Sequence, residues 1–323
     1  MSAGARRIAR DKDGALRLGT GVFALLVLLI VAGIGFELLR TSHLTLQKFG
    51  FSFWGGTAWN PVEGEFGAFP FIWGTLYSSI LALVLSTPVA LGIAIFASDL
   101  SPEVLRKPIG FLTELLAAVP SIVYGLWGIV VLVPAVRQLE LLAPAWLKKL
   151  PLFSGPPLGV GMLSAALILA VMVIPYSSSV AREILKAVPM SQREGAYALG
   201  ATRWEGIRAA IHYGRAGIFG AIMLGFGRAL GETMAVTMVI GNNPQVAASL
   251  FAPQHTMAAV IANEFSEASS DLHLSALAEI GLVLFAITLA INVLARLLIW
   301  NMTRQASAGK SRRAAAAREK AAA

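Results

Sequence analysis

The chain has 323 residues, of which 56% are hydrophobic and only 14% charged, and its mean hydropathy is +0.71. Soluble domains carry about a quarter charged residues, so this composition excludes an ordinary soluble protein and indicates a membrane protein. Cysteine is absent, which excludes a disulfide framework and thiolate metal sites.

Six stretches are long enough to cross a hydrocarbon core, which takes about 20 apolar residues. The first has too long an apolar core for a signal peptide and no small-residue cleavage site after it, so we expect an uncleaved anchor. The sequence predicts an all-α polytopic membrane protein with a short segment 1–18, a transmembrane domain 19–303 and a disordered basic tail 304–323. The expected spans are 19–39, 69–98, 109–136, 158–181, 217–241 and 274–300.

The basic residues are distributed unevenly between the connections. Five lysines and arginines precede the first span, two lie in the second connection, six in the fourth and six after Trp300, whereas the external connections hold five. This positive-inside asymmetry predicts that both termini are cytoplasmic, and it explains the net charge of +8 without any nucleic-acid partner. The GKS at 309–311 imitates the end of a phosphate-binding loop, but Arg304 stands where that loop needs glycine.

The first external connection, 40–68, is unusually rich in aromatic residues. One interpretation is that these side chains anchor the flanking helices at the membrane interface. The other is that they form a docking surface for an external partner. The residues are Phe49, Phe51, Phe53, Trp54, Trp59 and Phe66.

The cytoplasmic connection 182–216 is too polar to cross the membrane. The spacing of Ser191 and Glu194 fits a capping box, and Gly200 suits the left-handed position after a short helix. The pair Thr202 and Glu205 repeats this spacing and predicts a second helix to about residue 212. Two capped helices around a glycine favour a shaped protrusion, and a helical hairpin on the lipid headgroups is the alternative.

The run EGAYALGATRWEGI, residues 194–207, resembles the EAA loop of bacterial ABC importer permeases. In that family the loop is a coupling helix that sits in a groove of the ATPase subunit. The sequence departs from the family pattern at the middle alanine, which is glycine here, and at His212-Tyr213, where the family has Leu-Pro. The resemblance implies ATPase coupling for Glu194, Gly195, Ala196, Gly200 and Thr202.

The fifth predicted span carries two charges, Arg228 and Glu232, which four-residue spacing would place on one helical face. An arginine at mid-bilayer costs about 2.5–3.5 kcal/mol, so it should face the bundle interior, a partner or water. Gly227, Gly231 and Ala235 form a small-residue stripe that favours close helix packing. A guanidinium suits an oxyanion such as phosphate or sulfate, and Glu232 would hold it when the path is empty. The alternative is an internal ion pair that fixes helix register.

The other polar residues give weaker indications of a functional site. Asn242 and Asn243 would lie at the external mouth of the fifth span, where they would either donate to an anion or cap a helix. The four histidines are scattered without ligand spacing, so we expect no metal site. No catalytic arrangement or nucleotide-binding loop is apparent, and we expect no covalent chemistry on this chain.

Four segments together resemble the PstC-type permeases of phosphate ABC importers, over about residues 19 to 303. The resemblance implies a six-helix, type I importer permease bundle in the bacterial inner membrane, with Arg228 and Glu232 in the phosphate path. It implies three partners: a PstA-type permease, a PstB-type ATPase dimer that binds ATP and Mg²⁺, and a periplasmic PstS-type binding protein. The segments are GRALGETMAVTMVIGN, AAVPSIVYGLWGI, IPYSSSVARE and FGAFPFIWGTL.

Three alternative functions stay open on the residues alone. The cargo would be another oxyanion, such as sulfate or molybdate. A secondary transporter would couple an anion to protons through Glu232, but it leaves the cytoplasmic protrusion unexplained. A membrane interaction protein would report phosphate status and move nothing.

Overall fold

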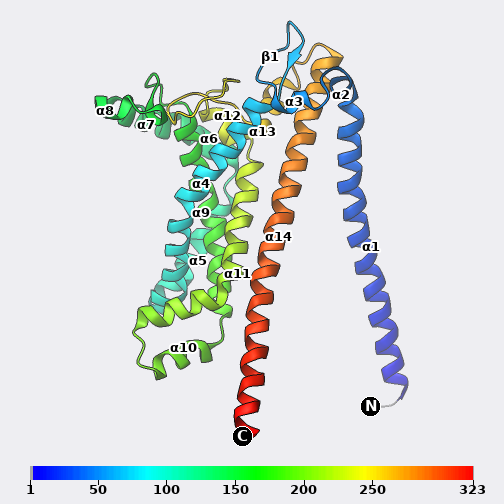
Figure 1. Ribbon diagram of the computed structural model, residues 1–323, viewed down its shortest axis with the longest axis vertical. Helices are drawn as coiled ribbons and strands as arrows, with labels where there is room; N and C mark the ends of the chain where they lie inside the picture. The colour runs from blue at the N-terminus through cyan, green and yellow to red at the C-terminus, as the bar shows by residue number, and fades with distance from the viewer. Residues whose placement is uncertain (1–2, 323) are drawn as a thin grey trace.

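The computed structural model describes the backbone of residues 3–322 and the side chains of residues 16–304. It is built almost entirely of helices (Figure 1). A central group packs closely together, and two long helices stand beside it. The central helices are α4 (Phe69–Ile95), α9 (Met162–Ala187) and α11 (Arg203–Leu230), and the long pair is α1 (Ala3–Thr41) and α14 (Asp271–Ala322).

The remaining elements are short. One set gathers at the end of the molecule opposite α10 (Met190–Ala198) and includes a small antiparallel hairpin (Figure 1). It consists of α2 (His43–Phe49), α3 (Ser52–Gly55), β1 (Trp59–Asn60), β2 (Glu65–Phe66), α12 (Met234–Val239) and α13 (Met257–Glu264). Between α4 and α9 lie the π-helical turn η1 (Phe96–Leu100), α5 (Glu103–Ala118), α6 (Ser121–Trp127), the π-helical turn η2 (Gly128–Leu132), α7 (Val133–Leu142), α8 (Ala145–Lys148) and the 3₁₀ turn η3 (Pro151–Phe153).

Among the described residues, five helical segments are long and apolar enough to cross a membrane. Four of them match the first, second, fourth and sixth predicted spans. The remaining segment, Ser121–Leu142, covers part of the third predicted span. The predicted span 217–241 is not among them, because its helix ends at Leu230 and a separate short helix, α12, follows. The segments are Leu16–Thr41, Phe69–Leu100, Ser121–Leu142, Met162–Ala187 and Asp271–Arg304.

The predicted span 109–136 is also interrupted. Helix α5 ends at Ala118, and Val119 and Pro120 are extended before α6 begins. The residue before a proline is disfavoured in the helical region, so the chain leaves the helix at Val119. The apolar run therefore forms an amphipathic helix and a separate spanning segment, where hydropathy alone indicated one helix.

The centre of the bundle is an apolar core between α4, α9 and α12. The segment after α12 turns back and packs on this core instead of staying outside it. Trp73 Nε1 donates to the Ala247 carbonyl at 3.0 Å, and Leu163 N donates to the Leu250 carbonyl at 2.8 Å. The connection 242–273 thus closes one end of the bundle.

Most of the aromatic side chains in 40–68 are packed inside the short elements at that end of the bundle. We call this group, formed by residues 43–66, α13 and the start of α14, the cap. Phe53 and Phe66 are 1% and 4% exposed, and they pack with Phe71 and with residues of α13 and α14. The Trp59 ring stands edge-on to Phe66 at 4.9 Å and to Phe71 at 4.8 Å. Of the six aromatic residues in 40–68, only Phe51 is almost fully exposed, at 90%. The two interpretations offered by the sequence, membrane anchoring and docking, therefore miss the main role, which is internal packing.

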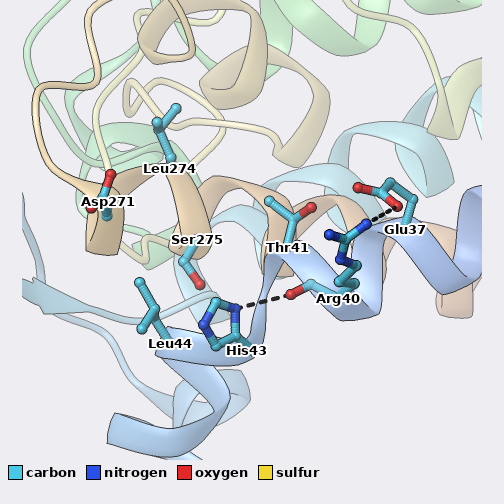
Figure 2. A pocket seen from close by; sticks show the side chains of 8 residues that line it. All are labelled: Glu37, Arg40, Thr41, His43, Leu44, Asp271, Leu274 and Ser275. Atoms are coloured by element: carbon cyan, nitrogen blue, oxygen red, sulfur yellow. Dashed lines mark hydrogen bonds and ion pairs between the residues drawn. The ribbon is translucent and has the colours of Figure 1, made fainter.

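The same cap joins the two long helices. Thr45 N donates to Ser275 Oγ at 3.1 Å, so α2 is attached to the start of α14. An open cavity of about 790 Å³ lies at this junction, and the Arg40–Glu37 ion pair is part of its lining (Figure 2). That pair is exposed, with side-chain exposures of 73% and 64%, so it contributes little to stability.

The start of α1, the end of α14 and α10 lie at the opposite end of the molecule (Figure 1). This is the grouping that the positive-inside pattern predicts for the two termini and the 182–216 connection. The side of the membrane that this end faces stays a prediction. Helix α14 is continuous to Ala322, where the sequence predicts a disordered tail, and the tail's side chains beyond Arg304 lie outside the described residues.

Candidate functional site

Arg228 lies in the last turn of α11, and an aromatic ring holds its side chain in place. Its Cζ atom is 4.2 Å from the centre of the Tyr176 ring on α9. Tyr176 is itself fixed, because its hydroxyl donates to the Ala117 carbonyl at 2.7 Å. A cation over an aromatic face contributes about 0.5–2 kcal/mol, depending on how far it is desolvated. The guanidinium is thus positioned by contacts from α9 and α5.

The hydrogen-bonding capacity of this guanidinium is not used up. Arg228 Nε is buried and has no hydrogen-bond partner among the described residues. No carboxylate of the described residues lies within ion-pair distance of Arg228. A buried donor without a partner costs about 1–3 kcal/mol, which an incoming acceptor would recover. The site is therefore prepared for an external acceptor.

Arg228 opens onto a cavity of about 640 Å³ between α9, α11 and α14. Glu232 lines the same cavity, and Asn292 of α14 adds an amide. The cavity lining thus includes one cation, one carboxylate and two neutral polar side chains, those of Tyr176 and Asn292. Its lining residues are Tyr176, Met223, Leu224, Gly227, Arg228, Gly231, Glu232 and Asn292.

The predicted ion pair between Arg228 and Glu232 is wrong for this structure. Helix α11 ends at Leu230, so the two residues do not share a helical face. The Glu232 carboxylate instead accepts a long hydrogen bond, 3.5 Å, from Ala235 N at the start of α12. The ring of Tyr176, rather than Glu232, positions the arginine.

The same helix end divides the predicted packing stripe. A Cβ atom on Gly227 would meet nothing within 4 Å, and one on Gly231 would meet only the Gly227 carbonyl at 3.9 Å. These two glycines line the cavity instead of packing against a helix of this chain. Ala235 is fully buried on α12, and a Cβ on Gly125 of α6 would lie 3.1 Å from its Cα. Only this last position packs closely within the chain.

Asn242 and Asn243 do not line the cavity. Asn242 has φ +50°, and its side-chain amide donates to the Thr237 carbonyl at 3.0 Å, so it caps the end of α12. Asn243 N donates to the Gln254 carbonyl at 3.1 Å. Of the two interpretations of Asn242, helix capping is the one that the structure shows.

The 182–216 connection contains α10 and the first turns of α11. Gly200 has φ +84°, the left-handed conformation expected of it. Thr202 caps α11 in the predicted capping box, because Thr202 N donates to Glu205 Oε2 at 2.7 Å and Glu205 N donates to Thr202 Oγ1 at 3.4 Å. The Glu205 carboxylate accepts hydrogen bonds from Thr202 N and also from Thr202 Oγ1, at 2.9 Å, and these two bonds lower the pKa of the Glu205 carboxyl.

Two details of this connection differ from the prediction. Pro189 precedes α10 and no side chain caps that helix, so Ser191 lies within the first turn and makes no capping box with Glu194. Pro189, with φ −55° and ψ 136°, occupies the cap position itself, and its side chain has no oxygen to accept a hydrogen bond from the helix. The second helix does not end near His212 but continues to Leu230 as a single helix of 28 residues. At 1.5 Å per residue, Arg203 and Arg228 lie about 38 Å apart along one rigid element.

Helix α10 presents an exposed surface at the end of the molecule. Glu194 and Gly195 are exposed and Ala196 is half-buried. Large apolar side chains lie around them, with Leu199 91% exposed and Trp204 60% exposed. Exposed apolar groups concentrated at one place mark an interaction surface.

One carboxylate that the sequence did not single out ties this surface to the bundle. Asp99, in η1 at the end of α4, forms an ion pair with Arg193 of α10 at 3.0 Å, and these side chains are 9% and 14% exposed. The Asp99 carbonyl also accepts a hydrogen bond of 2.8 Å from Arg203 of α11. The sequence carries only a weak signal for this role of Asp99. It is an acidic residue directly after a predicted span, in a connection whose other charged residues are mostly basic.

Among the described residues, no group of three or more His, Asp or Glu side chains is placed to hold a metal ion. The carboxylates of the site are single. The arrangement is suited to holding and releasing an anion.

Comparison with known proteins assigns this chain to a family. Residues 89–304 match the family described as binding-protein-dependent transport system inner membrane component. The chain is 45% identical over 293 residues to the phosphate transport system permease protein PstC of Mesorhizobium japonicum, covering 89% of this chain and 90% of that protein. It is 46% identical over 297 residues to the protein of the same name from Pasteurella multocida, covering 90% and 92%.

A solved structure supports the architecture. The MetNI methionine ABC transporter in an inward-facing conformation matches with a TM-score of 0.55 at 13% identity, covering 72% of this chain and 94% of that chain. This likeness concerns the fold alone. The predicted helical, ABC importer permease-like bundle is confirmed, whereas the count of six spans is not.

Proposed function

The chain belongs to the family of binding-protein-dependent transport system inner membrane components, and from this premise we propose that it is the transmembrane permease subunit of an ATP-driven importer of inorganic phosphate. Two relatives at 45% and 46% identity are named as phosphate permeases of the PstC type. The partners are then a PstA-type permease, a PstB-type ATPase dimer and a periplasmic PstS-type binding protein. The chain is a transport component of the inner membrane and not an enzyme.

The observation that carries the proposal is the position of the Arg228 guanidinium and its unused hydrogen-bond donor. Its guanidinium lines a cavity, is positioned by Tyr176, and keeps a buried Nε–H without a partner. A planar guanidinium donates two parallel hydrogen bonds to a tetrahedral oxyanion, which matches phosphate. Glu232 in the same cavity repels the anion and limits how tightly it is held, because transport requires that the site also release its cargo.

Helix α11 provides the mechanical link between the two ends of the site. It begins at the Thr202 cap beside α10 and ends at Arg228 and Leu230. A displacement of α10 by a partner ATPase therefore moves the arginine through one continuous helix. ATP and Mg²⁺ belong to that partner, and the role of this chain is to turn movement at α10 into a change of access at the cavity.

The proposal is tested by reconstitution. Proteoliposomes that contain the four-component complex should accumulate ³²P-phosphate only when the ATPase subunits hydrolyse ATP. A proton-coupled carrier would instead accumulate phosphate in a pH gradient without ATP. A reporter protein would move no phosphate under either condition. A tenfold excess of unlabelled sulfate or molybdate that suppresses uptake as well as phosphate does would assign another oxyanion as the cargo.

The Asp99–Arg193 ion pair supplies a prediction about coupling. Asp99→Asn should lower phosphate transported per ATP hydrolysed about tenfold, because it leaves Arg193, which is largely buried, without its carboxylate, and hydrogen bonds to charged groups are worth about 1.5–3 kcal/mol. The ratio is measured from ³²P uptake and phosphate release in the same proteoliposomes.

The matched control for this change is Glu103→Gln, which removes an exposed carboxylate at the start of α5. It should leave the ratio unchanged. The double variant Asp99→Asn/Arg193→Gln should recover part of the loss, since neither charge then stays unpaired. A double variant whose loss equals the sum of both single losses would show that the pair does not act as a unit.

A further inference from the structure

A second polar cavity, of about 450 Å³, lies between α5 and α9, at the ends of these helices nearest α10. It is separate from the cavity around Arg228 and shares no lining residue with it. Four of its lining side chains are cations, and one is a carboxylate. The lining consists of Arg106, Lys107, Gly110, Phe111, Glu114, Arg182 and Lys186.

Arg182 forms the fixed wall of this cavity. Its side chain is 9% exposed, and its Nη2 atom lies 3.2 Å from Glu114 Oε1 and 3.1 Å from Glu183 Oε1. The guanidinium also lies directly against Gly110, where any Cβ atom would collide with Nη1. Arg182 therefore holds α5 and α9 together, and two carboxylates offset its charge.

The two cations contributed by α5 are not offset in this way. Among the described residues, Arg106 makes only one hydrogen bond, a long one of 3.4 Å from Nη2 to the Ser101 carbonyl, and its buried Nε atom has no acceptor there. Lys107 is exposed and has no carboxylate within ion-pair distance in the described part of the chain. The cavity therefore keeps an excess of positive charge and an unused buried donor.

The surroundings of the cavity are apolar on one side. Phe111 and Leu112 of α5 follow the two cations by about one helical turn, and they are 65% and 54% exposed. Cations at the end of a helix above exposed apolar side chains are the arrangement expected where headgroups meet acyl chains. Basic pockets between membrane helices on the cytoplasmic side bind anionic headgroups.

We propose that this cavity binds a phosphate group, held by Arg106 and Lys107 beside Arg182. The source that the exposed apolar residues favour is the phosphodiester of an anionic phospholipid such as phosphatidylglycerol. Free inorganic phosphate offers the same oxyanion to the same donors. The bound group would fasten the start of α5 to α9 beside the Asp99–Arg193 pair. The inference does not depend on what passes Arg228.

The test compares the complete complex carrying Arg106→Gln/Lys107→Gln with the wild-type complex and with Arg17→Gln, a matched control that removes an exposed cation of α1. Complexes are purified from membranes, and retained phosphatidylglycerol is counted by native mass spectrometry. In phosphatidylcholine nanodiscs, ³²P-phosphate binding is measured by equilibrium dialysis. The Arg228 cavity is the same in all three proteins, so a difference between them belongs to the second cavity.

We expect the double variant to retain about 25-fold less phosphatidylglycerol than the wild type and the control, at equal yield of complex, since each of the two cations near an anionic surface contributes about a factor of five. A loss confined to ³²P-phosphate binding would support the same site with free phosphate as its ligand. Unchanged values in both measurements would overturn the proposal and leave the cavity as an internal ion-pair network.

Discussion

Replacing Arg228 with glutamine is expected to lower ATP-driven phosphate uptake about 10- to 100-fold, since a hydrogen bond to a charged group is worth about 1.5–3 kcal/mol. Glutamine keeps a donor but loses the charge and the planar fork that pairs with two phosphate oxygens. Assembly should be unaffected, because no ion pair of the described residues depends on this arginine. Uptake of ³²P-phosphate and yield of the four-component complex are measured on the same preparation.

Arg296→Gln is the matched control for this prediction. Arg296 is also an arginine within a predicted span, on α14, but it is exposed and does not line the cavity. Its replacement should leave uptake within about twofold of wild type, as expected of a surface substitution. Loss of the assembled complex in Arg228→Gln, with normal uptake per complex, would instead identify Arg228 as a residue that only positions helices.

Replacing Gly200 with valine is expected to uncouple ATP hydrolysis from uptake. Gly200 has φ +84°, a conformation that costs a residue with a Cβ about 1–2 kcal/mol and a β-branched residue more. Space is not the limit, because a Cβ there would meet nothing within 4 Å. The strain would therefore change the angle between α10 and α11. The expected result is ATPase activity near the wild-type level with phosphate uptake about tenfold lower, for a cost near 1.4 kcal/mol.

Two controls separate backbone strain from loss of a surface contact. Gly200→Asn should keep most of the coupling, since asparagine tolerates the left-handed region. Gly195→Ala should be neutral or slightly stabilising, because Gly195 lies within α10 with open space around it, and alanine is about 1 kcal/mol better than glycine in a helix. If valine at 200 leaves uptake per ATP unchanged, the α10–α11 junction does not transmit the movement.

The features predicted correctly from the sequence depend on neighbours along the chain. The left-handed Gly200 and the Thr202–Glu205 capping box are interactions over three to five residues, so the local pattern carries all the information they need. Hydropathy likewise reports four of the five apolar segments closely, because crossing a membrane is a property of a continuous stretch.

The helix ends inside apolar runs were harder to predict. Gly231 stands where a helix end would be signalled in a soluble protein, but its spacing with Gly227 and Ala235 also fits a packing stripe. The sequence cannot choose between these two uses of the same residues. In the structure, α11 ends at Leu230, α12 begins at Met234, and Ala235 of α12 packs against Gly125 on α6.

Composition and local spacing by themselves determined that this chain is a helical membrane protein with a capped protrusion between two helices and an arginine placed deep in an apolar run. Tertiary structure alone decided what that arginine touches. Tyr176 replaces Glu232 as its neighbour, and Asp99 reaches Arg203 across 104 residues of sequence. The reason is physical: hydrogen bonds within one or two turns follow from neighbouring residues, whereas contacts between helices depend on how separate elements pack, which no single stretch encodes.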